Sequence, residues 1–194
     1  MKKIFRILLD LDGVLADFDK GACYAHGISP QKMIELRTPG DWYLPTVFAK
    51  CKQQSVMSVE EFWQPITRGG AEFWVNLKEF SWHRELVLFI SSLKNTEDFH
   101  IITAPSQCPT SYTGKVRWIK KQYGAGFDRF AITPHKEIFA QPGVLLIDDR
   151  EENINKFVAA GGEGLIFPSQ GNSLHLFADD PMTYVRKMLA EKVG

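Results

Sequence analysis

Short apolar runs and amphipathic segments alternate over most of the chain. Five runs have the length and composition of buried strands, and they cover residues 4–9, 99–102, 129–132, 144–147 and 164–167. Apolar positions at helical spacing mark residues 81–93, 113–123 and 151–160, and a last helix is predicted from Asp180 and Pro181 to Glu191. Strands that alternate with helices at this interval predict an α/β fold with a doubly wound parallel sheet.

Residues 17–77 have a different pattern. This stretch is rich in aromatic residues, contains no apolar run typical of a strand, and is divided by prolines and glycines into short pieces. Such a pattern favours small helices and loops. We therefore expect a small helical cap at 17–77, inserted after the first strand, and a core formed by residues 1–16 and 78–194.

The amino-acid composition bears on whether the protein binds nucleic acid or membranes and on its cellular compartment. The 194 residues carry 23 Lys plus Arg and 23 Asp plus Glu, so the chain has no net charge that would attract nucleic acid or anionic membranes, and we expect no extended nucleic-acid binding. Three widely spaced cysteines without a CxxC pair favour a reducing compartment. The apolar run at the start is too short for a signal peptide, and none reaches the ~20 residues of a membrane span. We expect a soluble, cytoplasmic protein with no membrane partner, and a homodimer is left open.

Chemically reactive or charged side chains follow four of the predicted strands. They are Asp10 and Asp12 with Gly13, then Thr103, then Lys136, and finally Asp148 with Asp149. Open α/β sheets bind ligands at the carboxyl ends of their strands, and unpaired carboxylates are costly to bury in a core. Carboxylates from two strand ends can hold Mg²⁺, while a hydroxyl and a lysine can bind phosphate oxygens. One carboxylate can then form an aspartyl-phosphate while another moves the proton.

These residues, in this order, resemble the four motifs of the haloacid dehalogenase superfamily. The resemblance implies a Rossmann-like core with a cap after the first motif. It also implies that Asp10 is the nucleophile, that Asp12 is the general acid and base, and that Thr103 and Lys136 bind the phosphoryl group. Mg²⁺ would be held by Asp10, the backbone carbonyl of Asp12 and a fourth-motif acid, with Asp148 preferred and Asp149 close behind. Dehalogenase members lack the second aspartate, so the resemblance favours phosphoryl transfer.

A finer resemblance is to the 5'(3')-deoxyribonucleotidase branch. It is carried by residues 10–18, the Phe73-Trp74 pair, residues 103–105, residues 115–119 and residues 146–150. It implies a phosphatase acting on a nucleoside monophosphate, with a cap that stacks aromatic side chains on the base. The substrate contacts it implies are Phe18, Phe73, Trp74, Ala104 and Lys115. The sequence departs from the branch after Thr103, where Ala replaces the usual Ser, and at residues 82–84, where a Pro-Gly is absent.

Several alternatives stay open at this level. Lys115 competes with Lys136 for the catalytic role, and either could be a solvated surface lysine. The cap aromatics could form a small core instead of a ligand wall. The chain could also be a phosphatase for another small metabolite, a 3'-phosphatase acting on a nucleic-acid end, or a nucleotide-binding protein without catalysis.

Overall fold

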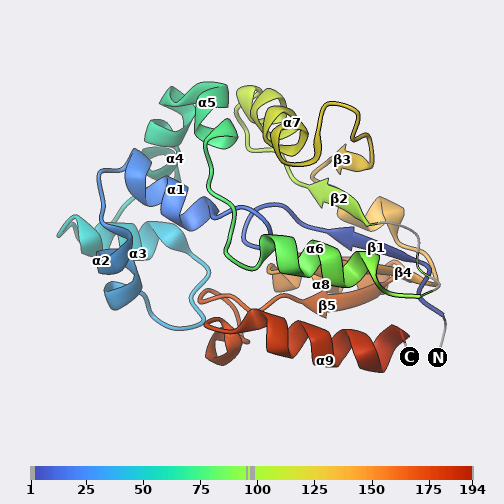
Figure 1. The fold of residues 1–194 in the computed structure, drawn as a ribbon. Helices are drawn as coiled ribbons and strands as arrows, with labels where there is room; N and C mark the ends of the chain where they lie inside the picture. The colour runs from blue at the N-terminus through green and yellow to red at the C-terminus, as the bar shows by residue number, and fades with distance from the viewer. Residues whose placement is uncertain (1–2, 95, 97–98, 194) are drawn as a thin grey trace.

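A parallel sheet of five strands forms the centre of the structure, a computed structural model that describes residues 3–94, 96 and 99–193 (Figure 1). The strands are β1 (Arg6–Leu9), β2 (His100–Thr103), β3 (Phe130–Ile132), β4 (Val144–Asp148) and β5 (Glu163–Ile166). Their order across the sheet is β3-β2-β1-β4-β5, and each neighbouring pair is parallel. The predicted α/β fold is therefore confirmed. The predicted ends of strands and of the helices outside 17–77 differ from the observed ends by at most three residues, as is usual for frayed ends.

Helices cover both faces of the sheet. On one face lie α6 (His83–Ser91), α7 (Thr110–Tyr123) and α9 (Pro181–Val193), and on the other lie α8 (Glu151–Ala159) and the 3₁₀ turn η1 (Lys136–Phe139); a second 3₁₀ turn, η2 (His175–Phe177), precedes α9. Side chains alternate between the faces along each strand, so Ile7 and Leu9 join the first layer and Leu8 joins the second. The sheet is thus buried on both sides, which explains its continuous apolar runs.

Five short helices lie between β1 and α6 and extend beyond the carboxyl end of the sheet (Figure 1). They are α1 (Phe18–Ala25), α2 (Pro30–Leu36), α3 (Leu44–Cys51), α4 (Val59–Arg68) and α5 (Gly70–Val75). The division into a cap and a core at residues 17 and 77 stays a prediction. The chain leaves and returns along paired backbone segments, because Asp17 N–H donates to Lys78 O at 2.8 Å and Phe80 N–H donates to Leu15 O at 3.1 Å.

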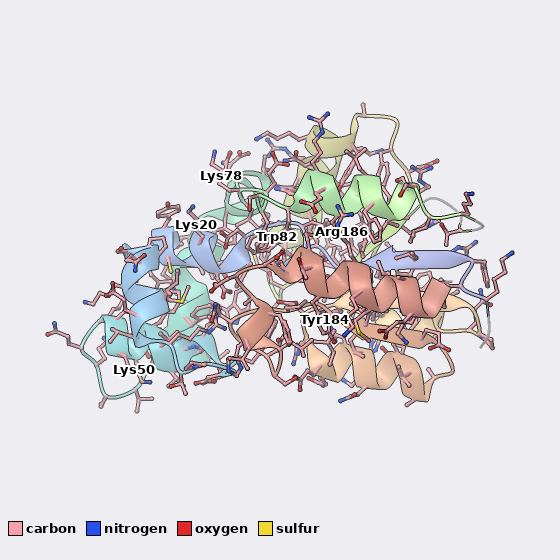
Figure 2. The ribbon with its side chains drawn as sticks, turned by 60° about the horizontal axis from the view of Figure 1, so that its bottom comes forward. Lys20, Lys50, Lys78, Trp82, Tyr184 and Arg186 are labelled. Atoms are coloured by element: carbon pink, nitrogen blue, oxygen red, sulfur yellow. The ribbon has the colours of Figure 1, made fainter. Side chains whose placement is uncertain are left out.

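Two tryptophans tie these connecting segments to the sheet domain. The indole N–H of Trp118 on α7 donates to Leu77 O at 2.9 Å, and that of Trp82 donates to Val14 O at 3.0 Å. Figure 2 shows Trp82 and, on α9, Arg186, whose guanidinium donates to Glu85 of α6 at 2.9 Å. Within the described residues, no helix is long and apolar enough to cross a membrane.

Helices α5 and α7 pack with their backbones in close approach. At Gly114 on α7, an added Cβ would lie 2.5 Å from Trp74 Cβ and 2.7 Å from Ala71 O, both on α5. Neither neighbour is the flexible end of a side chain, so glycine is required here for the two helices to meet.

Gly114→Ala is therefore expected to destabilise the protein by about 1–3 kcal/mol, because overpacking would outweigh the gain in helix propensity. Urea denaturation followed by circular dichroism measures the change. Gly126→Ala serves as the control, since an added Cβ there meets no atom within 4 Å. Equal stabilities for the two variants would contradict the close packing.

Candidate active site

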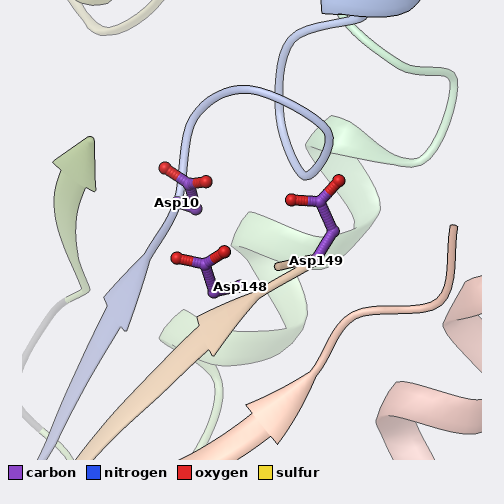
Figure 3. Close-up of side chains that lie close together, drawn as sticks. All are labelled: Asp10, Asp148 and Asp149. Carbon is purple, nitrogen blue, oxygen red and sulfur yellow. The ribbon is translucent and has the colours of Figure 1, made fainter. Parts of the chain in front are cut away.

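Three carboxylates from two neighbouring strands meet at the carboxyl end of the sheet (Figure 3). Asp10 directly follows β1, Asp148 ends β4 and Asp149 comes next in the chain. The strands are held in register here, because Asp10 N–H donates to Ile147 O at 2.9 Å. One oxygen of each carboxylate lies within 4.8 Å of the others, and all three residues are buried. This arrangement is a cluster of hard oxygen ligands suited to a divalent cation.

Lys136 at the start of η1 neutralises part of this charge. Its ammonium lies 2.7 Å from Asp10 Oδ1 and 2.6 Å from Asp148 Oδ2, and the residue is 3% exposed. Asp10 Oδ1 also accepts the N–H of Leu11 at 2.7 Å. No hydrogen bond within the described part of the chain reaches Asp10 Oδ2, so this oxygen is the one available to a ligand.

Asp148 and Asp149 differ in their surroundings. Both oxygens of Asp148 are engaged, since Oδ2 accepts from Lys136 and Asn153 and Oδ1 accepts from the Arg150 N–H. Among the residues that the structure covers, no donor reaches the carboxylate of Asp149, which lines a cavity. The carboxylate of Asp149 is therefore the less engaged of the two, whereas Asp148 is also the ion-pair partner of Lys136, and both belong to the carboxylate cluster that could hold a cation.

The buried charges perturb one another. Burial, together with the carboxylate of Asp148, raises the pKa of Asp10 to about 7, although Lys136 acts in the opposite direction. Burial, followed by the charges of Asp148 and Asp10, raises the pKa of Asp149 well above its ordinary value. Burial alone would lower the pKa of Lys136, but the charges of Asp10 and Asp148 outweigh burial and raise it. One ammonium thus faces three carboxylates, and the excess negative charge fits a bound cation.

Gly13 allows the first loop to pass over this cluster. Its φ of +81° lies in the left-handed region, and an added Cβ would lie 1.9 Å from Asp149 Oδ2. A side chain at this position would displace the carboxylate that the loop covers, which explains why glycine follows the DxD sequence.

A second group of polar side chains lies beside the first. Asp12 Oδ2 is paired with the ammonium of Lys115, which also donates to Thr103 Oγ1 at 2.8 Å and to Ala104 O at 2.7 Å. The carboxylate of Asp12 is therefore apart from the trio, and the structure brings Asp12, Thr103, Ala104 and Lys115 together around one ammonium.

Both groups border a cavity of about 620 Å³. Of the predicted site residues, those that line it are Asp10, Asp12, Phe18, Trp74, Thr103, Ala104, Lys136 and Asp149. The side chains of Asp148, Lys115 and Phe73 are not part of its lining. Phe73 lies edge-on to Phe18 and Trp74, with ring centroids 5.9 Å and 5.0 Å away. It therefore packs against two lining residues without itself lining the cavity.

Other aromatic residues in the wall were not singled out from the sequence. They are Trp42, Tyr43, Phe62, Trp63, Phe80 and Trp82. Trp42 and Tyr43 are 41% and 49% exposed, whereas Trp74 is 2% exposed and packs on Phe18 and on the ammonium of Lys115. The signal was present in the sequence, because Trp42 and Tyr43 stand between Pro-Gly and a further proline, where a loop can present rings to a ligand.

The chain is similar to known proteins in sequence and in fold. No protein-family model matches the chain. The human mitochondrial 5'(3')-deoxyribonucleotidase is 26% identical over 195 residues, which covers 92% of this chain and 81% of that protein.

Solved structures share the fold at low identity. A hydrolase from Streptococcus pneumoniae TIGR4 aligns with a TM-score of 0.57 at 15% identity, over 97% of this chain and 99% of that one. A haloacid dehalogenase-family hydrolase from Deinococcus radiodurans R1, solved with bound phosphate and sodium, also has a TM-score of 0.57, at 14% identity over 99% and 97% of the two chains. The chain therefore has the fold of haloacid dehalogenase-family hydrolases, gathers the four motif positions at one edge of its sheet, and resembles 5'(3')-deoxyribonucleotidases in sequence.

Proposed function

We propose that this chain is a Mg²⁺-dependent phosphatase that hydrolyses nucleoside monophosphates, as a 5'(3')-deoxyribonucleotidase does, through an aspartyl-phosphate on Asp10. The observation that carries the proposal is the state of Asp10. One of its oxygens is held by Lys136 and a backbone N–H, and the other has no partner among the described residues and belongs to a residue lining the cavity.

The proposed reaction has two steps. In the first, Asp10 Oδ2 attacks phosphorus, the bond from phosphorus to the ester oxygen breaks, and Asp12 gives its proton to that oxygen as the alcohol leaves. In the second, Asp12 takes a proton from water, the water oxygen attacks phosphorus, and the bond to Asp10 breaks to release inorganic phosphate. Lys136 offsets charge on the phosphoryl oxygens and on Asp10.

Asp10, Asp149 and the backbone carbonyl of Asp12 are the proposed ligands of Mg²⁺. When bound, this cation would offset the charge of the carboxylates and of the phosphoryl group. Asp148 would keep Lys136 in place through their ion pair.

The part of the cavity lined by Trp42 and Tyr43 is the proposed base subsite. Its exposed rings, Trp42 and Tyr43, offer flat apolar faces of the kind on which a base stacks, and Phe18 and Trp74 would form the inner wall. The cavity volume of about 620 Å³ is within the range of small-molecule sites. A phosphatase for another small phosphomonoester is the second candidate, because the phosphate end of the site does not depend on these rings. A cytoplasmic location stays a prediction of the sequence and a homodimer stays open, and the human relative is named as mitochondrial.

Asp10→Asn is expected to lower kcat for p-nitrophenyl phosphate in Mg²⁺ by at least about a thousandfold, because the nucleophile is lost. Asp12→Asn is expected to lower kcat by about 100- to 10,000-fold while Mg²⁺ binding persists. Steady-state assays and a Mg²⁺ titration measure both effects. Asp128→Asn is the matched control, because Asp128 is exposed and the variant makes the same change of side chain outside the site. Full activity of the Asp10 variant would exclude the proposed intermediate.

Trp42→Ala or Tyr43→Ala is expected to raise KM for nucleoside monophosphates about tenfold, because stacking on a base is worth about 1–3 kcal/mol. KM for p-nitrophenyl phosphate should be unchanged in a parallel titration, since its small ring would not reach the subsite. Tyr24→Ala is the control, as this tyrosine is 62% exposed and outside the cavity lining. An unchanged nucleotide KM in both variants would favour the second candidate.

The raised pKa values of Asp10 and Asp149 predict a pH dependence of stability. A carboxyl with a folded-state pKa above its unfolded value stabilises the fold at low pH, and for Asp10 this contribution is lost as pH rises from about 4 through about 7. The raised pKa of Asp149 acts in the same direction. The metal-free protein should therefore melt at a lower temperature at about pH 8 than at about pH 6. Mg²⁺ competes with protons for these oxygens, so it should raise the melting temperature more at the higher pH.

Asp149→Asn is expected to raise the melting temperature of the metal-free protein at about pH 8, because one buried repelling charge is removed, and to reduce the shift caused by Mg²⁺. Differential scanning fluorimetry at the two pH values measures both effects, with Asp128→Asn as the control. An undiminished Mg²⁺ shift in the Asp149 variant would remove it from the ligand set.

A further inference from the structure

Lys115 is a buried cation that the proposed reaction steps do not use. It lies in the second turn of α7 and is 1% exposed. It is absent from the lining of the cavity, whereas Asp12, Thr103 and Ala104, which surround its ammonium, all belong to that lining. The ammonium thus lies one layer behind the surface that a substrate would meet.

The hydrogen-bonding capacity of Lys115 is used up within the protein. An ammonium has three protons to donate and no acceptor. The three acceptors around Lys115 Nζ are Asp12 Oδ2, Thr103 Oγ1 at 2.8 Å and Ala104 O at 2.7 Å. Trp74 of α5 covers the remaining side, with its ring centroid 4.8 Å from Nζ. No proton of the ammonium is left for a phosphate oxygen.

These contacts fix the groups that face the substrate. Because Thr103 Oγ1 accepts from Lys115, its own hydroxyl proton is free to be donated to a phosphoryl oxygen. Because Asp12 Oδ2 is held by Lys115, the other oxygen, Oδ1, is the one left for proton transfer. Asp12 Oδ1 is buried, and no hydrogen-bond partner reaches it from the residues that the structure describes, so this oxygen has no structural task there.

We propose that Lys115 is a positioning residue, which holds Asp12 and Thr103 for proton transfer and phosphoryl binding and does not itself bind phosphate. This inference rests on the proposed phosphatase function, and it assigns the two buried lysines different tasks. Lys136 faces the cavity and the nucleophile, and Lys115 acts through the general acid and base. Since Trp74 packs on Lys115, the helix α5 between β1 and α6 also contributes to the position of Asp12.

The test compares Lys115→Met with the wild type and with Lys121→Met, an exposed lysine on the same helix. For a nucleoside monophosphate, Lys115→Met should lower kcat about 100-fold, while KM and the inhibition constant of inorganic phosphate change by less than about twofold. With p-nitrophenyl phosphate, whose leaving group needs no proton, the variant should give a rapid burst of p-nitrophenol followed by slow turnover, because only the second step then needs Asp12.

A double-mutant cycle adds a readout that a merely structural role would not move. In an Asp12→Asn background, Lys115→Met should cause little further loss of kcat, because the group it positions is already absent. Lys115→Gln, whose amide has two protons and no charge, gives the same comparison if the methionine variant does not fold.

Three results would overturn the positioning role. Phosphate inhibition weakened about tenfold at unchanged kcat would make Lys115 a phosphate ligand. Unchanged kcat and KM in a folded Lys115→Met variant would give Lys115 a structural role only. The same conclusion would follow if the losses of kcat caused by Lys115→Met and Asp12→Asn were fully additive. A wild type that hydrolyses neither substrate would overturn the proposed function and the positioning role together, whereas the first three results would leave the function intact.

Discussion

The site depends on the balance between three buried carboxylates and one buried ammonium. Asp10, Asp148 and Asp149 would repel one another within 4.8 Å, and Lys136 offsets only part of this charge by pairing with Asp10 and Asp148. The parallel pairing of β1 with β4 imposes the proximity, and the adjacent loop crosses at Gly13. The protein keeps an electrostatically costly arrangement at the edge of its sheet, which is typical of sites selected for function rather than for stability.

The helices between β1 and α6 contribute to the proposed catalytic group as well as to the cavity wall. Backbone contact at Gly114 fixes α5 against α7, and Trp74 of α5 covers the ammonium of Lys115. The packing of one short helix is therefore linked to the position of Asp12. The exposed residues Trp42 and Tyr43 come directly before α3 and are not part of this contact. The residues proposed to determine substrate preference are therefore separate from those proposed to support the chemistry.

Much of the fold and the motif positions could be predicted because they follow local rules. An apolar run that ends in Asp10-Leu11-Asp12-Gly13 can be recognised from a short stretch of sequence. Parallel strands then bring the ends of such runs together. The tasks of Asp148 and Asp149 were harder to separate, because they depend on which donors, such as Asn153, the fold brings to each carboxylate. The absence of Lys115 and Phe73 from the cavity lining depends on how α5 meets α7, and a periodic pattern within one segment cannot predict a contact between two segments.

The most direct test of the central claim is to trap the phosphorylated protein. Borohydride reduces an acyl-phosphate to an alcohol, so an aspartate phosphorylated during turnover is converted to homoserine. Wild-type protein quenched during hydrolysis of a nucleoside monophosphate in Mg²⁺, then reduced and analysed by peptide mass spectrometry, should carry homoserine at position 10. Homoserine at another position, or none while the protein turns over substrate, would contradict the assignment of Asp10 as the nucleophile.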